Sequence, residues 1–243
     1  AETPAGILNS VGLQNPGVDH FIDKDLPWLK KQNTVVIANI AGNTEEDYCN
    51  MARKLSATDI DMIELNISCP NVKSGGVAFG TSCTSVAHIT KRVRACCTKP
   101  LIVKLSPNVA DIAEIAKAAE SEGADALSLI NTLTGMRIDI DSRRPVLRNN
   151  TGGLSGAAVF PVAVRMVWQT ANAVSIPVIG MGGISSWQDA VEMLLAGASA
   201  LQIGTVLFHD PYAPVKIKEG LCTYLDKNGI RNIAELSGAV HPW

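Results

Sequence analysis

Short apolar runs alternate along the chain with stretches in which apolar residues recur at helical spacing. This alternation is typical of repeated βα units, in which helices cover a parallel sheet. Seven runs predict strands: Gly6–Asn9, Val35–Ile40, Met62–Ser68, Leu101–Leu105, Ala126–Asn131, Pro177–Met181 and Ala200–Gly204. Caps and apolar stripes predict helices between them, with the clearest at Thr44–Leu55, Asp111–Ala119 and Ser186–Ala196.

This order predicts an α/β fold, a (β/α)8 TIM barrel forming a single domain over residues 1–243, with one strand missing. Because a predicted strand opens the chain, we expect the missing first strand to lie upstream of Ala1. Two loops exceed a simple connection, at 9–29 and 132–156, and long ordered loops in compact domains are usually functional. The second contains the alternating segments MRIDID and PVLR, which predict a hairpin around Ser142-Arg143-Arg144. Its four arginines, taken singly, are most simply solvated surface charges.

Composition limits the classes of protein to consider. With 243 residues and 47% hydrophobic residues, the chain is long enough for one large core. A net charge of −2 argues against a nucleic-acid surface. The sequence contains no apolar stretch of about 18 residues, so it predicts no membrane span. The six cysteines show no C-x-x-C spacing, so no zinc or iron–sulfur site is predicted. These features favour a reduced, cytoplasmic protein.

Cys69 stands where a predicted buried strand becomes a polar loop, in the run ELNISCPNVKSGGVAFG. The carboxyl ends of parallel strands form the ligand-binding face of α/β barrels. Asn66 and Asn71 flank this cysteine, and an amide that both donates and accepts hydrogen bonds suits a neutral heterocycle with imide-like edges. A buried structural cysteine beside a turn explains Cys69 equally well when it is taken alone.

Glycines follow the last two predicted strands and precede a further helix, where backbone N–H groups can approach a phosphate. They occur in the runs Gly180-Met181-Gly182-Gly183, Gly204-Thr205 and Gly152-Gly153-Leu154-Ser155-Gly156. Lys104 lies inside the apolar run LIVKL, and a buried ammonium there requires an anionic or electron-rich partner. A flavin fits, because its reduced ring gathers negative charge that a fixed cation stabilises. The alternative is an edge-strand lysine that reaches water.

Several segments together resemble dihydroorotate dehydrogenase, an FMN enzyme of pyrimidine synthesis, and the resemblance spans essentially the whole chain. They are NSVGLQN from Asn9, IANIAG from Ile37, NISCPN from Asn66, KLSPN from Lys104, INT from Ile130, GGLSG from Gly152, GMGG from Gly180 and IGT from Ile203. Cysteine at position 69 resembles the class 1 enzymes. The runs NVKSGGVAFGT and NTLTGMRID resemble class 1B, whose catalytic subunit pairs with an iron–sulfur flavoprotein that contains FAD and passes electrons to NAD.

The resemblance implies roles for matched residues. Cys69 would be the general base that removes the C5 proton of dihydroorotate while a hydride passes to FMN. The substrate, converted to orotate, would be bound by Asn9, Gly12, Leu13, Asn66, Asn71, Asn131 and Thr132. The cofactor FMN would be held by Asn39, Lys104, Ile130, Ser155, Gly156, Gly182, Gly183, Gly204 and Thr205. A homodimeric core is also implied.

Other functions share some of these features. A dihydropyrimidine dehydrogenase domain has a similar barrel, FMN and N-x-S-C-P segment but acts on uracil-like rings. A tRNA dihydrouridine synthase also pairs FMN with a cysteine, but the net charge of −2 provides no basic surface for RNA. A barrel that binds a partner and contains no flavin is the alternative without catalysis.

Overall fold

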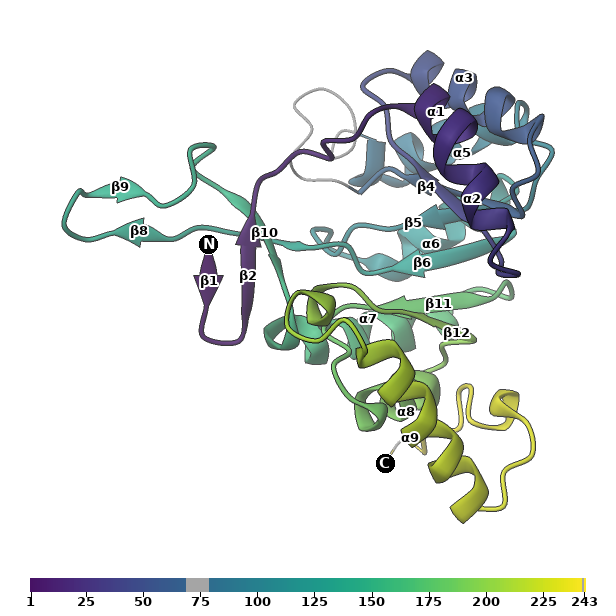
Figure 1. Ribbon diagram of the computed structural model, residues 1–243, viewed down its shortest axis with the longest axis vertical. Helices are drawn as coiled ribbons and strands as arrows, with labels where there is room; N and C mark the ends of the chain where they lie inside the picture. Colours follow the sequence, from purple (N-terminus) through teal and green to yellow (C-terminus); the bar gives the residue numbers. More distant parts are fainter. Residues whose placement is uncertain (69–78, 242) are drawn as a thin grey trace.

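A parallel sheet of six strands forms the centre of the protein in the computed structural model, which describes residues 1–68, 79–241 and 243. Figure 1 shows this curved sheet between the helices. The sheet order is β12-β11-β6-β5-β4-β3. The strands are β3 (Ile37–Ile40), β4 (Met62–Asn66), β5 (Leu101–Lys104), β6 (Ala126–Leu129), β11 (Val178–Met181) and β12 (Ala200–Gln202). Six of the seven predicted strands are therefore confirmed as members of one βα sheet.

Helices connect these strands and cover the sheet, as the alternating pattern predicts. They are α3 (Glu45–Ser56), α5 (Cys83–Arg94), α6 (Ile112–Ser121), α7 (Phe160–Ala171), α8 (Trp187–Leu195) and α9 (Ala213–Lys227), with short 3-10 turns η2 (Ala157–Val159), η3 (Thr205–Phe208) and η4 (Ile233–Glu235). Capping boxes start α3 at Thr44 and α8 at Ser186. The buried stripe of α6 contains the predicted residues Ile112, Ile115, Ala116 and Ala119. Among the described residues, no helix is long and apolar enough to cross a bilayer.

The strand Gly6–Asn9 forms as predicted, but the prediction that it belongs to the barrel sheet was wrong. As β2 it joins a separate antiparallel sheet, ordered β1-β2-β10-β7, with β1 (Glu2–Thr3), β7 (Leu133–Gly135) and β10 (Gly152–Ser155). A short apolar run indicates a strand without indicating its partner. The contact with β10 is close, since a Cβ at Gly6 would lie 2.1 Å from the Ser155 carbonyl oxygen.

The expected loop at 9–29 is partly helical. It contains α1 (Val18–His20), the π-helical turn η1 (Phe21–Asp25) and the start of α2 (Leu26–Lys30). Leu26 is buried, and Phe21 and Ile22 pack against the core. Helices of three to five residues contain too few turns to show a helical period, so sequence periodicity misses them.

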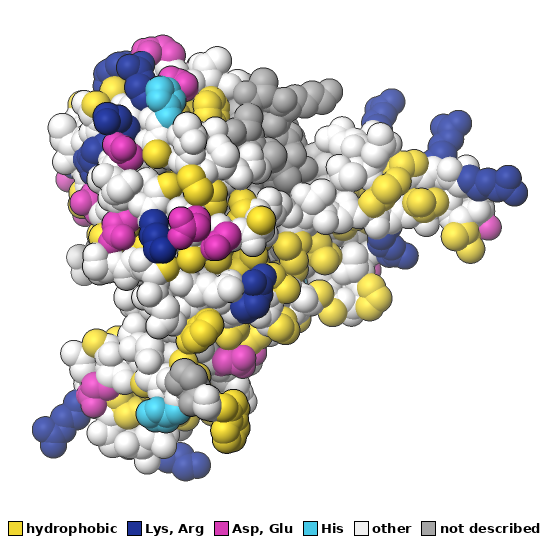
Figure 2. Space-filling model, turned by 180° about the vertical axis from the view of Figure 1, so that it is seen from behind, with side chains coloured by type: hydrophobic (Ala, Val, Ile, Leu, Met, Phe, Trp, Pro, Cys, Tyr) yellow, Lys and Arg dark blue, Asp and Glu magenta, His cyan; other side chains and the backbone are white. Residues whose placement is uncertain are grey.

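The predicted hairpin in 132–156 is confirmed as a projecting arm (Figure 1). Its strands are β8 (Ile138–Asp139) and β9 (Arg144–Pro145), and Asp139 pairs with Arg144. Figure 2 shows apolar side chains and basic side chains together on this arm. Ile140 is 85% exposed at its tip, and Met136 and Ile138 are also exposed. The glycines at 152–153 precede a helix as predicted: they belong to β10, which η2 and α7 follow.

Candidate active site

A cavity of about 840 Å³ lies at the carboxyl ends of the parallel strands. Eight of the nine residues predicted to hold a cofactor line it, and only Asn39 lies elsewhere. They are Lys104, Ile130, Ser155, Gly156, Gly182, Gly183, Gly204 and Thr205. These residues lie in separate segments between Lys104 and Thr205, and the fold brings them together at one cavity.

Glycine is required in this wall for two different reasons. Gly156, Gly182 and Gly183 have φ of 102°, 120° and 81°, in the left-handed region that favours glycine. A Cβ at Gly183 would also lie 2.7 Å from the Gly156 carbonyl oxygen and 2.8 Å from Phe160 Cβ. Gly204 differs, since its φ is −130° and a Cβ there would have no atom within 4 Å. The space beside Gly204 is therefore open, as a wall that receives a ligand requires.

Lys104 ends β5 between β4 and β6, in the interior of the sheet. This position excludes the alternative of an edge-strand lysine. Lys104 lines the cavity, and within the described parts of the chain its ammonium group forms no ion pair and no hydrogen bond. A half-buried ammonium without an internal partner favours an anionic or electron-rich ligand beside it.

The predicted substrate residues Asn131 and Thr132 line the same cavity. Asn9, on β2, pairs with Gly153 of β10. Thr132 lies against that same glycine, because a Cβ at Gly153 would be 2.1 Å from Thr132 Oγ1. The antiparallel sheet therefore places Asn9 near Thr132, although the two residues are 123 positions apart in the chain.

Asn66 is the centre of a buried hydrogen-bonded group. Its Nδ2 donates to Asn39 Oδ1 at 3.2 Å, and its Oδ1 accepts from Ser68 Oγ at 3.1 Å. Asn131 Nδ2 donates to Ser68 Oγ at 2.8 Å and, more weakly, to Asn66 Oδ1 at 3.5 Å. The Tyr48 hydroxyl donates to the Asn66 carbonyl oxygen at 3.0 Å. Hydrogen bonds thus link the predicted site residues Asn39, Asn66 and Asn131. Both ends of the Asn66 amide are bonded to other side chains of the protein.

Glu64 lies beneath these amides and is only 4% exposed. Its Oε1 accepts hydrogen bonds from Ser128 Oγ at 2.7 Å and from Gln202 Nε2 at 2.9 Å. Its Oε2 accepts one from Asn39 Nδ2. Three donors from β6, β12 and β3 therefore converge on one carboxylate of β4, which satisfies its buried oxygens.

A second cavity, of about 550 Å³, lies beside the edge strand β3. It is lined by the predicted substrate residues Gly12 and Leu13 and by the predicted cofactor residue Asn39. These three residues do not line the larger cavity. The structure therefore divides the predicted site between two neighbouring spaces, which the Glu64 contacts connect through Asn39 and Gln202.

The candidate base Cys69 and the predicted substrate residue Asn71 lie outside the described residues. The residue before them, Ser68, is buried and is held by Asn66 and Asn131.

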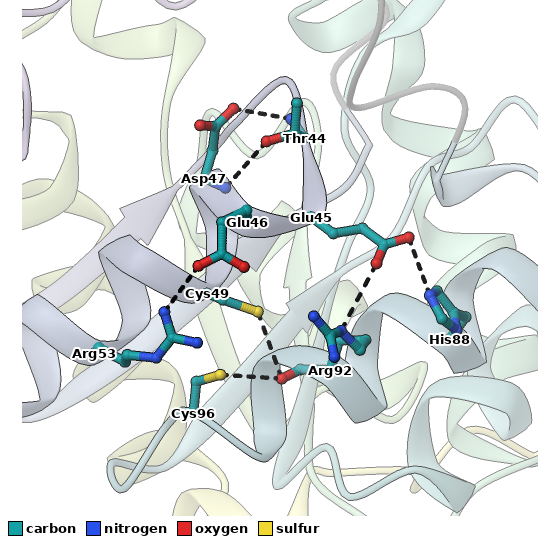
Figure 3. Close-up of polar contacts among 9 residues, drawn as sticks. All are labelled: Thr44, Glu45, Glu46, Asp47, Cys49, Arg53, His88, Arg92 and Cys96. Atoms are coloured by element: carbon teal, nitrogen blue, oxygen red, sulfur yellow. Dashed lines mark hydrogen bonds and ion pairs between the residues drawn. The ribbon is translucent and has the colours of Figure 1, made fainter.

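Cys49 is a buried structural cysteine between helices α3 and α5 (Figure 3). Its Sγ lies 3.6 Å from the Arg92 carbonyl oxygen, which Cys96 Sγ also contacts at 3.4 Å. Burial and the neighbouring Cys96 raise the pKa of Cys49 to about 11, so it stays protonated at neutral pH. Glu45 contacts His88 at 3.0 Å and Arg92 at 3.7 Å across the same helix pair.

The family model described as dihydroorotate dehydrogenase matches residues 1–225. The chain belongs to the dihydroorotate dehydrogenase family. It is 56% identical to the catalytic subunit of dihydroorotate dehydrogenase B (NAD(+)) from Alkaliphilus metalliredigens over 240 residues, which are 99% of this chain and 80% of that protein. The protein of the same name from Bacteroides thetaiotaomicron is also 56% identical, over 99% of this chain and 80% of its own length.

A solved structure supports the fold. The crystal structure of DHODH in complex with ferulenol from Eimeria tenella superimposes with a TM-score of 0.79. The superposition covers 96% of this chain and 71% of the Eimeria chain, and the two sequences are 23% identical. The predicted α/β barrel class is confirmed for this member of the dihydroorotate dehydrogenase family.

Sequence reasoning missed Glu64, which connects the two cavities of this family member, and its donors Gln202 and Ser128 within the sheet. The signal for Glu64 was present, because a carboxylate inside the apolar run MIELN needs donors as much as Lys104 needs an acceptor. Gln202 and Ser128 showed no signal, since neither belongs to a motif and their partner lies more than 60 residues away.

Proposed function

We propose that this chain catalyses the flavin-dependent oxidation of dihydroorotate to orotate in pyrimidine biosynthesis. The observation that carries the proposal is the 840 Å³ cavity, where Lys104 and the glycines meet Asn131 and Thr132. One space thus combines a cation, an open glycine wall and amides suited to a pyrimidine ring. Membership of the dihydroorotate dehydrogenase family and the names of the relatives support the same reaction.

The residues around the cavity fit FMN, which supplies a two-electron acceptor when bound. The open space at Gly204 and the backbone of Gly156, Gly183 and Thr205 suit the phosphate. Lys104 supplies the fixed positive charge that stabilises electron density on the ring. Ile130, Ser155 and Gly182 complete this wall, and Asn39 contributes from the neighbouring space.

Oxidation of dihydroorotate requires loss of a proton from C5 and of a hydride from C6, which leaves the C5=C6 double bond of orotate. In our proposal the Cys69 thiolate would accept the proton, and FMN held in the cavity would supply the acceptor for the hydride. Asn131 and Thr132 bind the ring, together with Asn9, Gly12, Leu13, Asn66 and Asn71. The contact between Asn131 and Ser68 supports this assignment, because it places an amide beside the residue that precedes Cys69.

We also propose a partner for the reoxidation step. The relatives are named as catalytic subunits of an NAD(+) enzyme, which implies a further subunit. An iron–sulfur protein containing FAD would carry the electrons from this chain to NAD. A homodimeric core and a cytoplasmic location remain predictions.

Anaerobic reduction of the bound flavin tests the proposed reaction. Dihydroorotate should bleach the visible absorption of the FMN-loaded protein, whereas dihydrouracil should not. Bleaching by dihydrouracil alone would favour a dihydropyrimidine dehydrogenase activity. A protein that binds no FMN would favour the barrel without catalysis.

The same assay tests the base. Cys69→Ser should keep FMN and slow the bleaching at least 100-fold near neutral pH, because a serine hydroxyl is a far weaker base. Cys83→Ser, at an exposed position that starts α5, is the matched control and should bleach at the normal rate. Equal rates in the two variants would remove Cys69 from the mechanism.

A further inference from the structure

We propose that Glu64 is a positioning residue that fixes the orientation of two amide side chains, Asn39 and Gln202, one in each of the two neighbouring cavities. An amide side chain has one donating end and one accepting end, so its neighbours decide which end faces a ligand. A carboxylate only accepts hydrogen bonds. Glu64 therefore compels each amide that contacts it to point its NH2 group inward. The ligand side of the inference rests on the proposed function.

On one side, Glu64 orients the series of amides that ends at Asn131. Asn39 donates its Nδ2 to Glu64, which leaves its Oδ1 to accept from Asn66 Nδ2. Asn66 Oδ1 then accepts from Ser68 and Asn131. The series has one direction of donation throughout, and Asn131 Oδ1 finally accepts the backbone N–H of Thr132 at 2.8 Å.

On the other side, Glu64 orients Gln202, which lines the larger cavity. Because Gln202 Nε2 donates to the carboxylate, its Oε1 is the end left to accept. Within the described residues Gln202 Oε1 accepts no hydrogen bond. The geometry thus assigns Gln202 as an acceptor for an N–H donor on the bound ligand.

Glu64→Gln tests the proposal with little change of shape. A glutamine has only one accepting oxygen, so it cannot accept from both Asn39 and Gln202 at their present positions. One of the two amides must turn. We expect the side-chain NH2 signals of these residues, and those of Asn66 and Asn131, to shift or double in NMR spectra of the ligand-free chain. FMN affinity should fall about tenfold, the effect of one lost hydrogen bond.

Ser128→Ala is the matched control, because it removes a donor to Glu64 Oε1 without touching either amide. Its NH2 signals should stay at their original positions, and its FMN affinity should stay within twofold of the original. A merely structural role for Glu64 predicts lower thermal stability in both variants with unchanged NH2 signals and affinity, which would overturn the proposal.

A double variant and a measurement on the original chain complete the test. Glu64→Gln combined with Gln202→Glu moves the carboxylate to the other strand. The glutamine that then stands on β4 can again accept from Asn39, and the Asn66 and Asn131 signals should return. If Glu64→Gln does not fold, hydrogen exchange of the Asn39 and Asn66 NH2 groups decides, with slow exchange expected and exchange at the solvent rate contradicting the proposal. A chain that binds no FMN contradicts the proposed function, while the NMR result still judges the role of Glu64.

Discussion

The two sides of the candidate site use different parts of the polypeptide. The glycine side consists of Gly156, Gly182, Gly183 and Gly204 with Lys104, and it offers backbone, open space and one charge. The amide side consists of Asn131, which lines the cavity, and of Asn66 and Asn39 beyond it. Ser68 links Asn131 to Asn66, Asn66 donates to Asn39, and Asn39 donates to Glu64. The glycine side depends on the absence of side chains, and the amide side depends on which end of each amide donates a hydrogen bond.

This difference explains which substitutions each side tolerates. On the glycine side a single added methyl group collides with backbone atoms or fills the space for a ligand. On the amide side the volume matters less than the number of donors and acceptors, because a buried polar group without a partner costs about 1–3 kcal/mol. The glycine side is therefore a steric template, and the amide side is a hydrogen-bonded one.

The largest effect is expected on the glycine side, for Gly183→Ala. Its φ of 81° and the collision with the Gly156 carbonyl oxygen should lower the free energy of unfolding by about 3 kcal/mol and abolish FMN retention. Gly229→Ala is the matched control, with a φ of 67° and no atom within 4 Å of the added Cβ. It should cost only about 1 kcal/mol and keep FMN. Equal losses of stability, measured by urea unfolding, would show that the collision does not matter.

A smaller effect is expected outside the cavity, at Cys49. Its pKa in the folded protein, about 11, lies above the ordinary thiol value of 9.0, so folding favours the protonated form. This contribution to stability is complete below pH 9 and is lost as the pH rises toward 11. Cys49→Ala should therefore show a weaker fall in the free energy of unfolding between pH 9 and 11. An identical fall in both proteins would contradict the raised pKa.

The sequence predicted the glycine side better than the amide side for a physical reason. Gly182, Gly183 and Gly204 follow strands whose ends meet at one edge, so a short local pattern predicted that they lie together at one cavity. The amide side depends on contacts between β3, β4 and β6, and its key acceptor Glu64 is bonded to residues 25, 64 and 138 positions away. Residue type alone does not reveal such partners.

The same distinction separates the correct and incorrect parts of the predicted fold. The six βα strands were predicted because helices of regular period lie between them. Gly6–Asn9 was assigned to the wrong sheet, since its partner β10 is about 150 residues away and no helix marks the connection. The helices within 18–30 were missed because each is shorter than two turns of pattern.

The most direct test of the two-sided site is a crossed titration of two variants. Lys104→Met keeps the length of the side chain and removes its charge, and Asn131→Ala removes the amide that contacts Ser68. FMN is titrated into each apoprotein, and orotate into each protein saturated with FMN. We predict that Lys104→Met weakens FMN binding at least tenfold, while Asn131→Ala keeps FMN affinity within twofold and weakens orotate at least tenfold. Equal weakening of both ligands by both variants would contradict the division of the cavity into a cofactor side and a substrate side.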